Sequence, residues 1–288
     1  MPPDLFDRDL LALRRARAAA APGGPADFLH AVAADEVADR LAAVNRRFHA
    51  PAIVGPRAAL WAERLRAAET PPARTAADAE ILDLAPGGHD LVVHALALHW
   101  ANDPVGQLVQ CRRALAPDGL FVGALFGAGT LAELRAALAE AEVAETGGLS
   151  PRVAPMGEIR DLGGLMQRAG FAMPVADSLR VEASYADALA LMRDLRAMGE
   201  TNVMRARLRR PTRRRVIARA AALCQDRLAG PDGRVRAGFE IVFLTGWAPA
   251  EGQPKALRPG SAGARLADAL GVAEQSAGER AGPGRRDD

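Results

Sequence analysis

The chain has 288 residues, of which 49% are hydrophobic and 25% are charged, the balance of an ordinary globular protein. Its formal net charge of +2 excludes a general electrostatic attraction to nucleic acid or to an anionic membrane. The two cysteines exclude a disulfide framework and indicate a reducing compartment. The segment MPPDLFDRDLLALRRARAAA lacks the layout of a signal peptide, and the longest apolar run, LVVHALAL, is too short for a transmembrane helix. We therefore expect a cytoplasmic protein without a transmembrane segment.

The amino-terminal region is predicted to be helical. A basic helix at 4–20 is followed by the helix-breaking stretch APGGP and by a second helix at 26–48, in which apolar residues recur at helical spacing. A short apolar strand is predicted at 52–55, where Gly55 and Pro56 end it, and a helix is predicted at 57–68.

The middle of the chain alternates strands and helices. The run DLVVHALALHW follows a turn and is apolar on both faces, which predicts a buried strand at 90–98, and a second such strand is predicted at 119–126. Helices at 104–115 and 131–144 follow these strands, and the capping box TLAE at 130–133 opens the second helix. The alternation predicts a parallel sheet with right-handed crossovers.

The last third of the chain is predicted to complete the sheet and cover its edge. A helix at 157–169 precedes a strand at 171–181, and a wholly helical insertion is predicted at about 184–229. The final strand, at 236–247, is expected to run antiparallel because it follows a long excursion rather than a short crossover. We expect the amino-terminal helices to form a lid near the crevice at the carboxyl ends of the strands and the insertion to cap the carboxyl edge.

The predicted organisation has three parts. An amino-terminal helical segment spans 1–48, and an α/β domain with a mostly parallel sheet spans 49–250. The tail at 251–288 is rich in proline and glycine and is predicted to be partly disordered.

Several stretches together resemble one family. They include LFDRDLLALRRARA, DRLAAVNRRF, DLVVHALALHWANDPVGQLVQCRRALAPDGLFVGALFG, LSPRVAPMGEIRDLGGLMQRAGFAMPVADS, MRDLRAMGETN and DGRVRAGFEIVFLTGWAP. Their order and density resemble the family of the mitochondrial NADH:ubiquinone oxidoreductase (complex I) assembly factor 5 and its bacterial relatives. The resemblance implies the Rossmann-like class I methyltransferase fold and S-adenosylmethionine (SAM) as the cofactor. The mitochondrial member is associated with arginine hydroxylation of a complex I subunit, so the resemblance also implies a protein partner.

The cofactor residues that this fold requires are incomplete. The first strand should end in a glycine-rich turn that lets the backbone approach the cofactor, but here only Gly55 is present and Pro56 lacks a backbone donor. The second strand, with its acidic ribose ligand, is missing or vestigial, and Asp78 matches the acidic position that faces the adenine in the family. The cofactor candidates are Val54, Gly55, Asp78 and His99. We expect SAM binding to be weak or undetectable; the alternative is a SAM site with altered ribose contacts.

A group of polar and aromatic residues follows the strand at 90–98. His99, Trp100, Asn102 and Asp103 should lie at the carboxyl edge of the sheet, where class I enzymes place groups that face the substrate. The alternative is that Trp100 covers the end of the sheet and that Asn102 or Asp103 caps the helix at 104–115.

Further candidates for contact with a substrate or partner come from two helices. In the stretch MGETN, Gly199 is a plausible helix cap, and Glu200 and Asn202 would line the substrate side, as the resemblance implies, or remain solvated. Arg14 and Arg15 belong to the basic amino-terminal helix. The full set of partner candidates is Arg14, Arg15, Trp100, Asn102, Asp103, Glu200 and Asn202.

Other chemistries lack their motifs. The five histidines do not provide the two-histidine, one-carboxylate set of a non-haem iron centre, and no zinc spacing or serine-nucleophile signature is present, so no metal and no catalytic residue is assigned. The arginine series between 205 and 219 has no interleaved aromatic residues, which favours a solvated or protein-contacting helix over nucleic-acid binding.

Three functions remain open. The first is a SAM-dependent enzyme that modifies a protein side chain during complex I assembly. The second is a non-catalytic assembly factor with a methyltransferase-like fold. The third is a carboxyl methyltransferase that acts on a small molecule or a carrier protein, which the stretches MGETN and FEIVFLTGWAP favour least.

Overall fold

The structure is a computed structural model that describes residues 4–66 and 70–254. Residues Met1–Gln253 form one compact unit, which holds the whole sheet and the helices packed on it. The predicted disorder of the tail concerns 251–288, of which all but the first four residues lie outside the described part. The boundaries predicted at 48 and 250 stay predictions.

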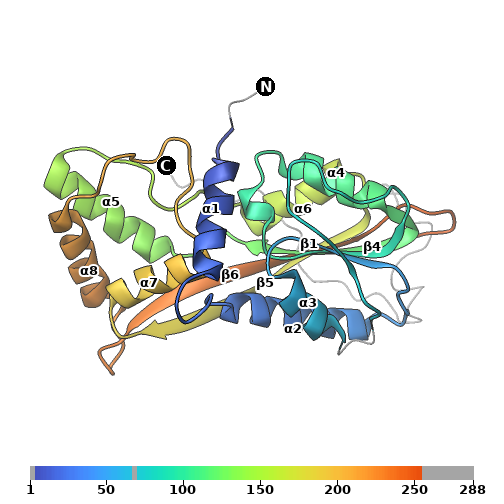
Figure 1. Ribbon diagram of the computed structural model, residues 1–288, viewed down its shortest axis with the longest axis horizontal. Helices are drawn as coiled ribbons and strands as arrows, with labels where there is room; N and C mark the ends of the chain where they lie inside the picture. The colour runs from blue at the N-terminus through green and yellow to red at the C-terminus, as the bar shows by residue number, and fades with distance from the viewer. Residues whose placement is uncertain (1–3, 67–69, 255–288) are drawn as a thin grey trace, which may run out of the picture. The chain divides into compact units, whose positions relative to one another are not determined.

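A mixed sheet forms the centre of the described unit (Figure 1). Its strand order is β2-β1-β3-β4-β6-β5, with β1, β2, β3 and β4 parallel and with β6 antiparallel to both β4 and β5. The predicted antiparallel final strand and the parallel middle strands are therefore confirmed. The strands are β1 (Pro51–Val54), β2 (Arg74–Ala76), β3 (His89–His94), β4 (Leu115–Phe126), β5 (Ala172–Tyr185) and β6 (Val235–Trp247).

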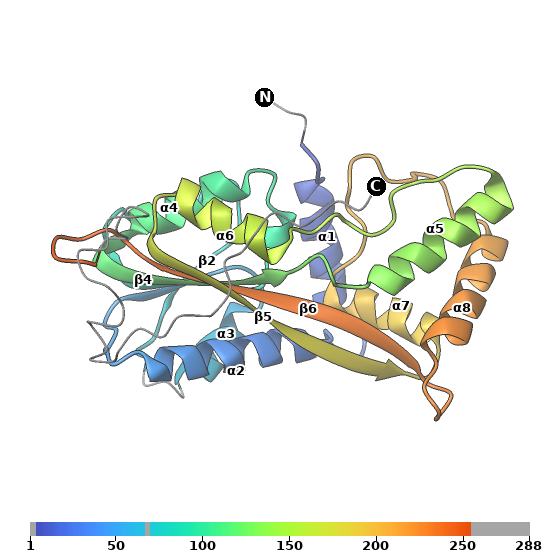
Figure 2. The same cartoon turned by 180° about the vertical axis from the view of Figure 1, so that it is seen from behind.

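Helices cover both faces of this sheet, which is why the middle strands are apolar on both sides. Figures 1 and 2 show α4 and α6 on one face and α2 and α3 on the other. Helices α5, α7 and α8 pack where β5 and β6 extend past the parallel strands. The helices are α1 (Arg8–Ala19), α2 (Phe28–Ala43), α3 (Ala58–Leu65), α4 (Pro104–Ala114), α5 (Ala132–Thr146), α6 (Ile159–Arg168), α7 (Ala188–Met198) and α8 (Arg214–Leu228).

The two amino-terminal helices have different roles. Helix α1 lies across the carboxyl edge, where its side chains contact the segments that follow β2 and β3. Helix α2 instead packs on α3 and contributes Leu29, Val37 and Leu41 to the core beneath the sheet. The expectation of a lid is confirmed for α1 and wrong for α2, whose apolar stripe needs a sheet face to bury it.

The second strand, predicted to be missing or vestigial, is present between Gly55 and Asp78 as a very short strand. Strand β2 has three residues, Arg74–Ala76, and pairs with β1 in parallel. Two of the three side chains are exposed, so the segment carries no apolar pattern that would predict a strand. No helix is described between β2 and β3.

The helical insertion begins later than expected and is interrupted in its middle by a segment that is not helical. Strand β5 continues to Tyr185, because its pairing with β6 extends to Val235. Residues 199–213 between α7 and α8 are not helical. The prediction of continuous helix over 184–229 is therefore wrong, and the cap consists of two helices and a connecting segment.

The strand predicted at 90–98 is also shorter. It ends at His94, because Leu96 takes a left-handed φ of 49° that an extended strand cannot contain, and a 3-10 turn follows at Leu98–Trp100.

Local capping signals were partly correct. Asp103 accepts from the amide of Gly106 at 2.8 Å and Gly199 ends α7 with a φ of +81°, as expected. The capping box at 130–133 does not form: Leu131 is the N-cap of α5 and makes no side-chain bond there. The Thr130 hydroxyl instead bonds the backbone of Glu240 on β6.

The Gly55→Ala substitution should lower the free energy of unfolding by about 2–4 kcal/mol. The φ of Gly55 is +132°, and an added Cβ would lie 2.9 Å from the carbonyl oxygen of Ala95. Urea unfolding followed by circular dichroism measures the loss. The control is Gly233→Ala, where φ is +73° and nothing lies within 4 Å of the added atom, so its cost should be about 1 kcal/mol. Equal losses would contradict a role for the close approach to Ala95.

Candidate functional site

The carboxylate of Asp78, just after β2, is bound by two arginines of α1. Arg15 Nη1 donates to both carboxylate oxygens at 3.0 Å, and Arg8 Nη2 donates to Oδ2 at 3.0 Å and also to the Asp78 carbonyl. Arg8 Nη1 further donates to the carbonyl oxygen of Trp100 at 3.0 Å. The two arginines are seven positions apart, so two helical turns place them on one face of α1. They connect α1 to the ends of β2 and β3.

A second buried carboxylate, that of Glu200, meets the turn after β3. Trp100 Nε1 donates to Glu200 Oε2 at 2.6 Å, and His99 Nε2 lies 3.2 Å from the same oxygen. The amide of Phe126 donates to His99 Nδ1, so Nδ1 is an acceptor and the proton lies on Nε2, facing Glu200. Arg15 Nη2 lies 4.0 Å from Glu200 Oε1 and links the two carboxylates into one network.

The surroundings keep both carboxylates ionised at neutral pH. Burial on its own would raise the pKa of Asp78, but the charges of Arg15 and Arg8 outweigh it and hold the pKa below the usual value. Burial likewise opposes ionisation of Glu200, and its contacts with His99, Arg15 and Trp100 outweigh that effect and lower the pKa. Both carboxylates are therefore held as ions by their partners and neither is a free acid or base, whereas the buried Nη2 of Arg15 has no hydrogen-bond partner among the described residues.

Asn102 anchors the start of the chain to the same edge. Its Oδ1 accepts from the amide of Phe6 at 2.8 Å and its Nδ2 donates to the Phe6 carbonyl at 3.2 Å. Phe6 pairs with Met204 in an antiparallel bridge and packs edge-on against Trp100. Asp103, in contrast, serves as the cap of α4.

The residues predicted to hold SAM do not fit that cofactor in this arrangement. The Asp78 carboxylate is used by two arginines of the same chain, and the amide of Gly55 donates to the carbonyl of Ala76 at 3.0 Å. Val54 is fully buried in the sheet, and the His99 side chain is 1% exposed. The groups that would contact a nucleoside therefore already have partners within the chain or are covered.

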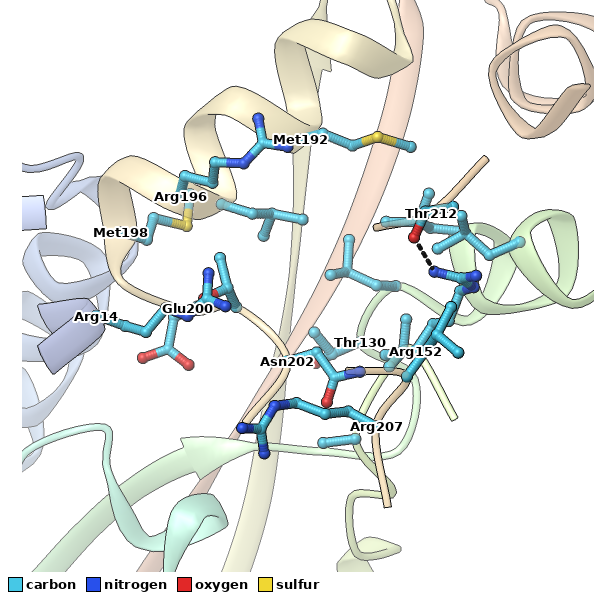
Figure 3. Close-up of a pocket in the computed structure, with 18 of the residues that line it drawn as sticks. Arg14, Thr130, Arg152, Met192, Arg196, Met198, Glu200, Asn202, Arg207 and Thr212 are labelled. Carbon is cyan, nitrogen blue, oxygen red and sulfur yellow. Dashed lines mark hydrogen bonds between the residues drawn. The ribbon is translucent and has the colours of Figure 1, made fainter. Parts of the chain in front are cut away.

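A cavity of about 680 Å³ lies beside this network (Figure 3). Its walls come from α1, α5, α7 and the segment 200–212. Trp100 and Glu200 belong both to the network and to the cavity wall, and Arg14 and Asn202 also line the cavity. The apolar lining includes Leu134, Leu138, Met192 and Leu195. We call this space the cap cavity.

The sequence candidates thus fall into separate places. Asp78, His99, Trp100, Arg15 and Glu200 come together in one network, whereas Val54 and Gly55 are part of the sheet. Asn202 donates to the Pro151 carbonyl at 2.8 Å and accepts from the Met204 amide at 3.0 Å.

Arg8 was not predicted, although its spacing from Arg15 was a usable signal. No cluster able to hold a metal ion occurs in 4–66 or 70–254.

The Asp78→Asn substitution should lower the free energy of unfolding at pH 7 by about 2–4 kcal/mol, because two guanidinium groups lose their carboxylate. The pKa of Asp78 is lowered on folding, so its contribution is present above the unfolded-state pKa and is lost as pH falls through the folded-state pKa. The difference from wild type should therefore shrink below about pH 4. Urea unfolding of the wild type and the variant, at pH 7 and below about pH 4, measures this difference in the free energy of unfolding.

The matched control is Asp83→Asn, which removes an exposed ion pair to Arg74 and should cost less than about 1 kcal/mol. An Asp78→Asn loss that is the same at both pH values would contradict the ionic explanation.

The comparisons with known proteins agree with this fold. Residues 37–123 match the family model described as "Methyltransferase domain". The chain is 40% identical over 192 residues to the Danio rerio protein named "Arginine-hydroxylase NDUFAF5, mitochondrial", a match covering 67% of this chain and 60% of that protein. The human protein of that name is 39% identical over 197 residues, covering 67% and 56%. A "Malonyl-[acyl-carrier protein] O-methyltransferase" of Laribacter hongkongensis is 40% identical over 179 residues, covering 62% and 58%.

The chain therefore spans less than two thirds of the length of each of these relatives. No helix within 4–66 or 70–254 has the length and apolar composition that crossing a membrane would require. The methyltransferase-domain match, the strand order and the identity to these proteins agree with one another. The chain belongs to the class I methyltransferase superfamily and is a homologue of the NDUFAF5 proteins.

Proposed function

We propose that the chain is an assembly factor for respiratory NADH dehydrogenase (complex I) that works by binding a protein partner at the cap cavity. One observation carries this proposal. Four of the residues that the sequence marks for partner contact, Arg14, Trp100, Glu200 and Asn202, come from three separate segments and line the same cavity. The identity to NDUFAF5 proteins supports complex I as the setting.

The internal network favours binding over SAM chemistry. The contacts of Asp78 with Arg8 and Arg15 use the carboxylate that the family pattern assigns to the cofactor. The same arginines hold α1 against the edge of the sheet, and two other residues of this helix, Leu10 and Arg14, line the cap cavity. In this proposal the former cofactor groups support the shape of a partner site.

Deletion of the gene should abolish complex I activity, measured as NADH:quinone oxidoreductase activity of isolated membranes. Wild type should restore activity, and a Trp100→Ala, Glu200→Ala double variant should not, since it removes the 2.6 Å contact and two groups of the cavity wall. The matched control is Asp103→Asn, which alters an edge residue outside the cavity and keeps a capping side chain. Immunoblots must show equal protein levels. Normal complex I activity in the deletion strain would refute the proposed role.

A second candidate is SAM-dependent methylation of a protein or carrier-protein group. The methyltransferase-domain match and the Laribacter hongkongensis relative favour it. It requires the chain to bind SAM, whereas the Asp78 carboxylate and the Gly55 amide already have partners within the chain.

Calorimetric titration of the purified chain with SAM and with S-adenosylhomocysteine separates the two candidates. Loss of the glycine turn and of a free acidic ligand should remove about 3–5 kcal/mol, or about 150- to 4,000-fold in affinity. We expect weak or undetectable binding. A dissociation constant in the low micromolar range would favour the methyltransferase and contradict the binding-only function.

A further inference from the structure

The cap cavity has a strong excess of positive charge. Its lining in the described part of the chain includes one carboxylate, that of Glu200, which already contacts Trp100 and His99. The same lining includes six arginines, namely Arg14, Arg152, Arg196, Arg207, Arg209 and Arg210. The two charge types are therefore far from balanced.

Among the described residues, two of these arginines have acidic partners. Arg152 Nη2 lies 2.7 Å from Glu142 Oε1, and Arg207 Nη2 lies 3.2 Å from Asp7 Oδ2. The other four, which are Arg14, Arg196, Arg209 and Arg210, form no ion pair with any residue in 4–66 or 70–254. Figure 3 shows Arg14 and Arg196 on the side of the cavity opposite Arg152.

Two buried polar atoms of the lining also lack partners. The Nε of Arg14 and the hydroxyl of Thr201 are shielded from solvent, and neither has a hydrogen-bond partner among the described residues. Buried donors are normally satisfied, and leaving one without a partner costs about 1–3 kcal/mol. These atoms indicate a ligand that accepts hydrogen bonds.

Further arginines follow the cavity-lining segment along the chain. Arg213, Arg214 and Arg215 follow Arg209 and Arg210, are exposed and form no ion pair within the described ranges. Later on the same helix, Arg219 and Arg227 pair with Glu145 and Glu140 of α5 at 3.6 and 2.8 Å. The fold thus balances the later arginines of α8 and leaves the earlier group unbalanced. We call the group Arg209, Arg210, Arg213, Arg214 and Arg215 the arginine strip.

We propose that the cap cavity and the arginine strip together bind an acidic peptide segment of the partner protein, with an apolar side chain seated against Met192 and Leu195. This inference rests on the proposed function and specifies the chemistry of its partner. A single small anion would need only part of such a surface, whereas an extended acidic chain can occupy the cavity and follow the strip. Glu200 is committed to its own contacts, so the described lining of the cavity offers no free carboxylate to a cationic ligand.

Nucleic acid is the weaker alternative. Single strands bind through aromatic side chains that stack on bases, and the segment from Arg205 to Arg219 contains no aromatic residue.

Fluorescence anisotropy with the full chain tests the proposal. The probe is a short blocked peptide in which leucine alternates with glutamate, and its counterpart carries glutamine in place of glutamate. The glutamate peptide should bind about tenfold more tightly, because it offers charge-assisted hydrogen bonds. Its affinity should also fall as salt rises from about 0.01 to 0.15 M.

Matched variants distinguish an effect of the cavity arginines on binding from an effect of the net charge of the protein. Arg14→Gln combined with Arg196→Gln should weaken binding about tenfold. Arg17→Gln combined with Arg193→Gln removes the same charge from the same two helices at exposed positions outside the cavity, and should change the affinity by less than about twofold. Unfolding curves show whether each variant is folded, and Arg14→Lys with Arg196→Lys should retain most of the binding.

Three results would overturn the inference: equal binding of the two peptides, equal effects of the two variant pairs, or displacement of the peptide by equimolar inorganic phosphate or oligo-dT. The outcome is independent of the deletion experiment. A failure of peptide binding, with complex I lost in the deletion strain, would remove the acidic partner and leave the assembly role intact. Peptide binding together with normal complex I activity in the deletion strain would support an acidic ligand and refute the assembly role.

Discussion

A carboxylate that leaves water must gain cationic partners, and Asp78 gains both of its partners from α1. Arg8 and Arg15 fix the position of this helix across the ends of β2 and β3. The position of α1 in turn defines one wall of the cap cavity and brings Arg15 toward Glu200. The site is therefore organised by a contact between two parts of one chain, at the place where related proteins are expected to hold a nucleoside.

A methyltransferase fold can carry more than one kind of site at this edge. The fold gathers polar groups at the carboxyl edge of its parallel strands, whatever those groups do. In this chain Asp78 and Glu200 have partners at that edge, and buried donors without a partner among the described residues occur both there, at Arg15 Nη2, and at the cap cavity, at Arg14 Nε. Cavities are present both beside Asp78, next to α1, and at the cap.

The sequence correctly predicted the strands in which the apolar residues form a clear pattern along the chain. The apolar runs of β3 and β4 and the final strand β6 were recognised because burial on both faces leaves a continuous pattern. Strand β2 was missed because three mostly exposed residues carry no pattern, and the extension of β5 to Tyr185 depends on its pairing with β6, a strand much later in the chain. For the site, sequence reasoning chose Asp78, Arg15 and Glu200 separately. Their contact across long sequence separations, and the part of Arg8, required the structure.

The bridge between Phe6 and Met204 has a consequence for synthesis of the chain. Asp7 donates its amide to the carbonyl of Val203, and Arg207 reaches back to Asp7 across 200 positions. A ribosome adds roughly 5–20 residues per second, so the start of the chain waits about 10–40 s for these partners to be made. During that interval the backbone of Phe6 and Asp7 lacks the pairing that Val203 and Met204 supply, whereas Asp78, the partner of Arg8 and Arg15, has already been made. The cavity wall is thus among the last parts of the molecule that translation can complete.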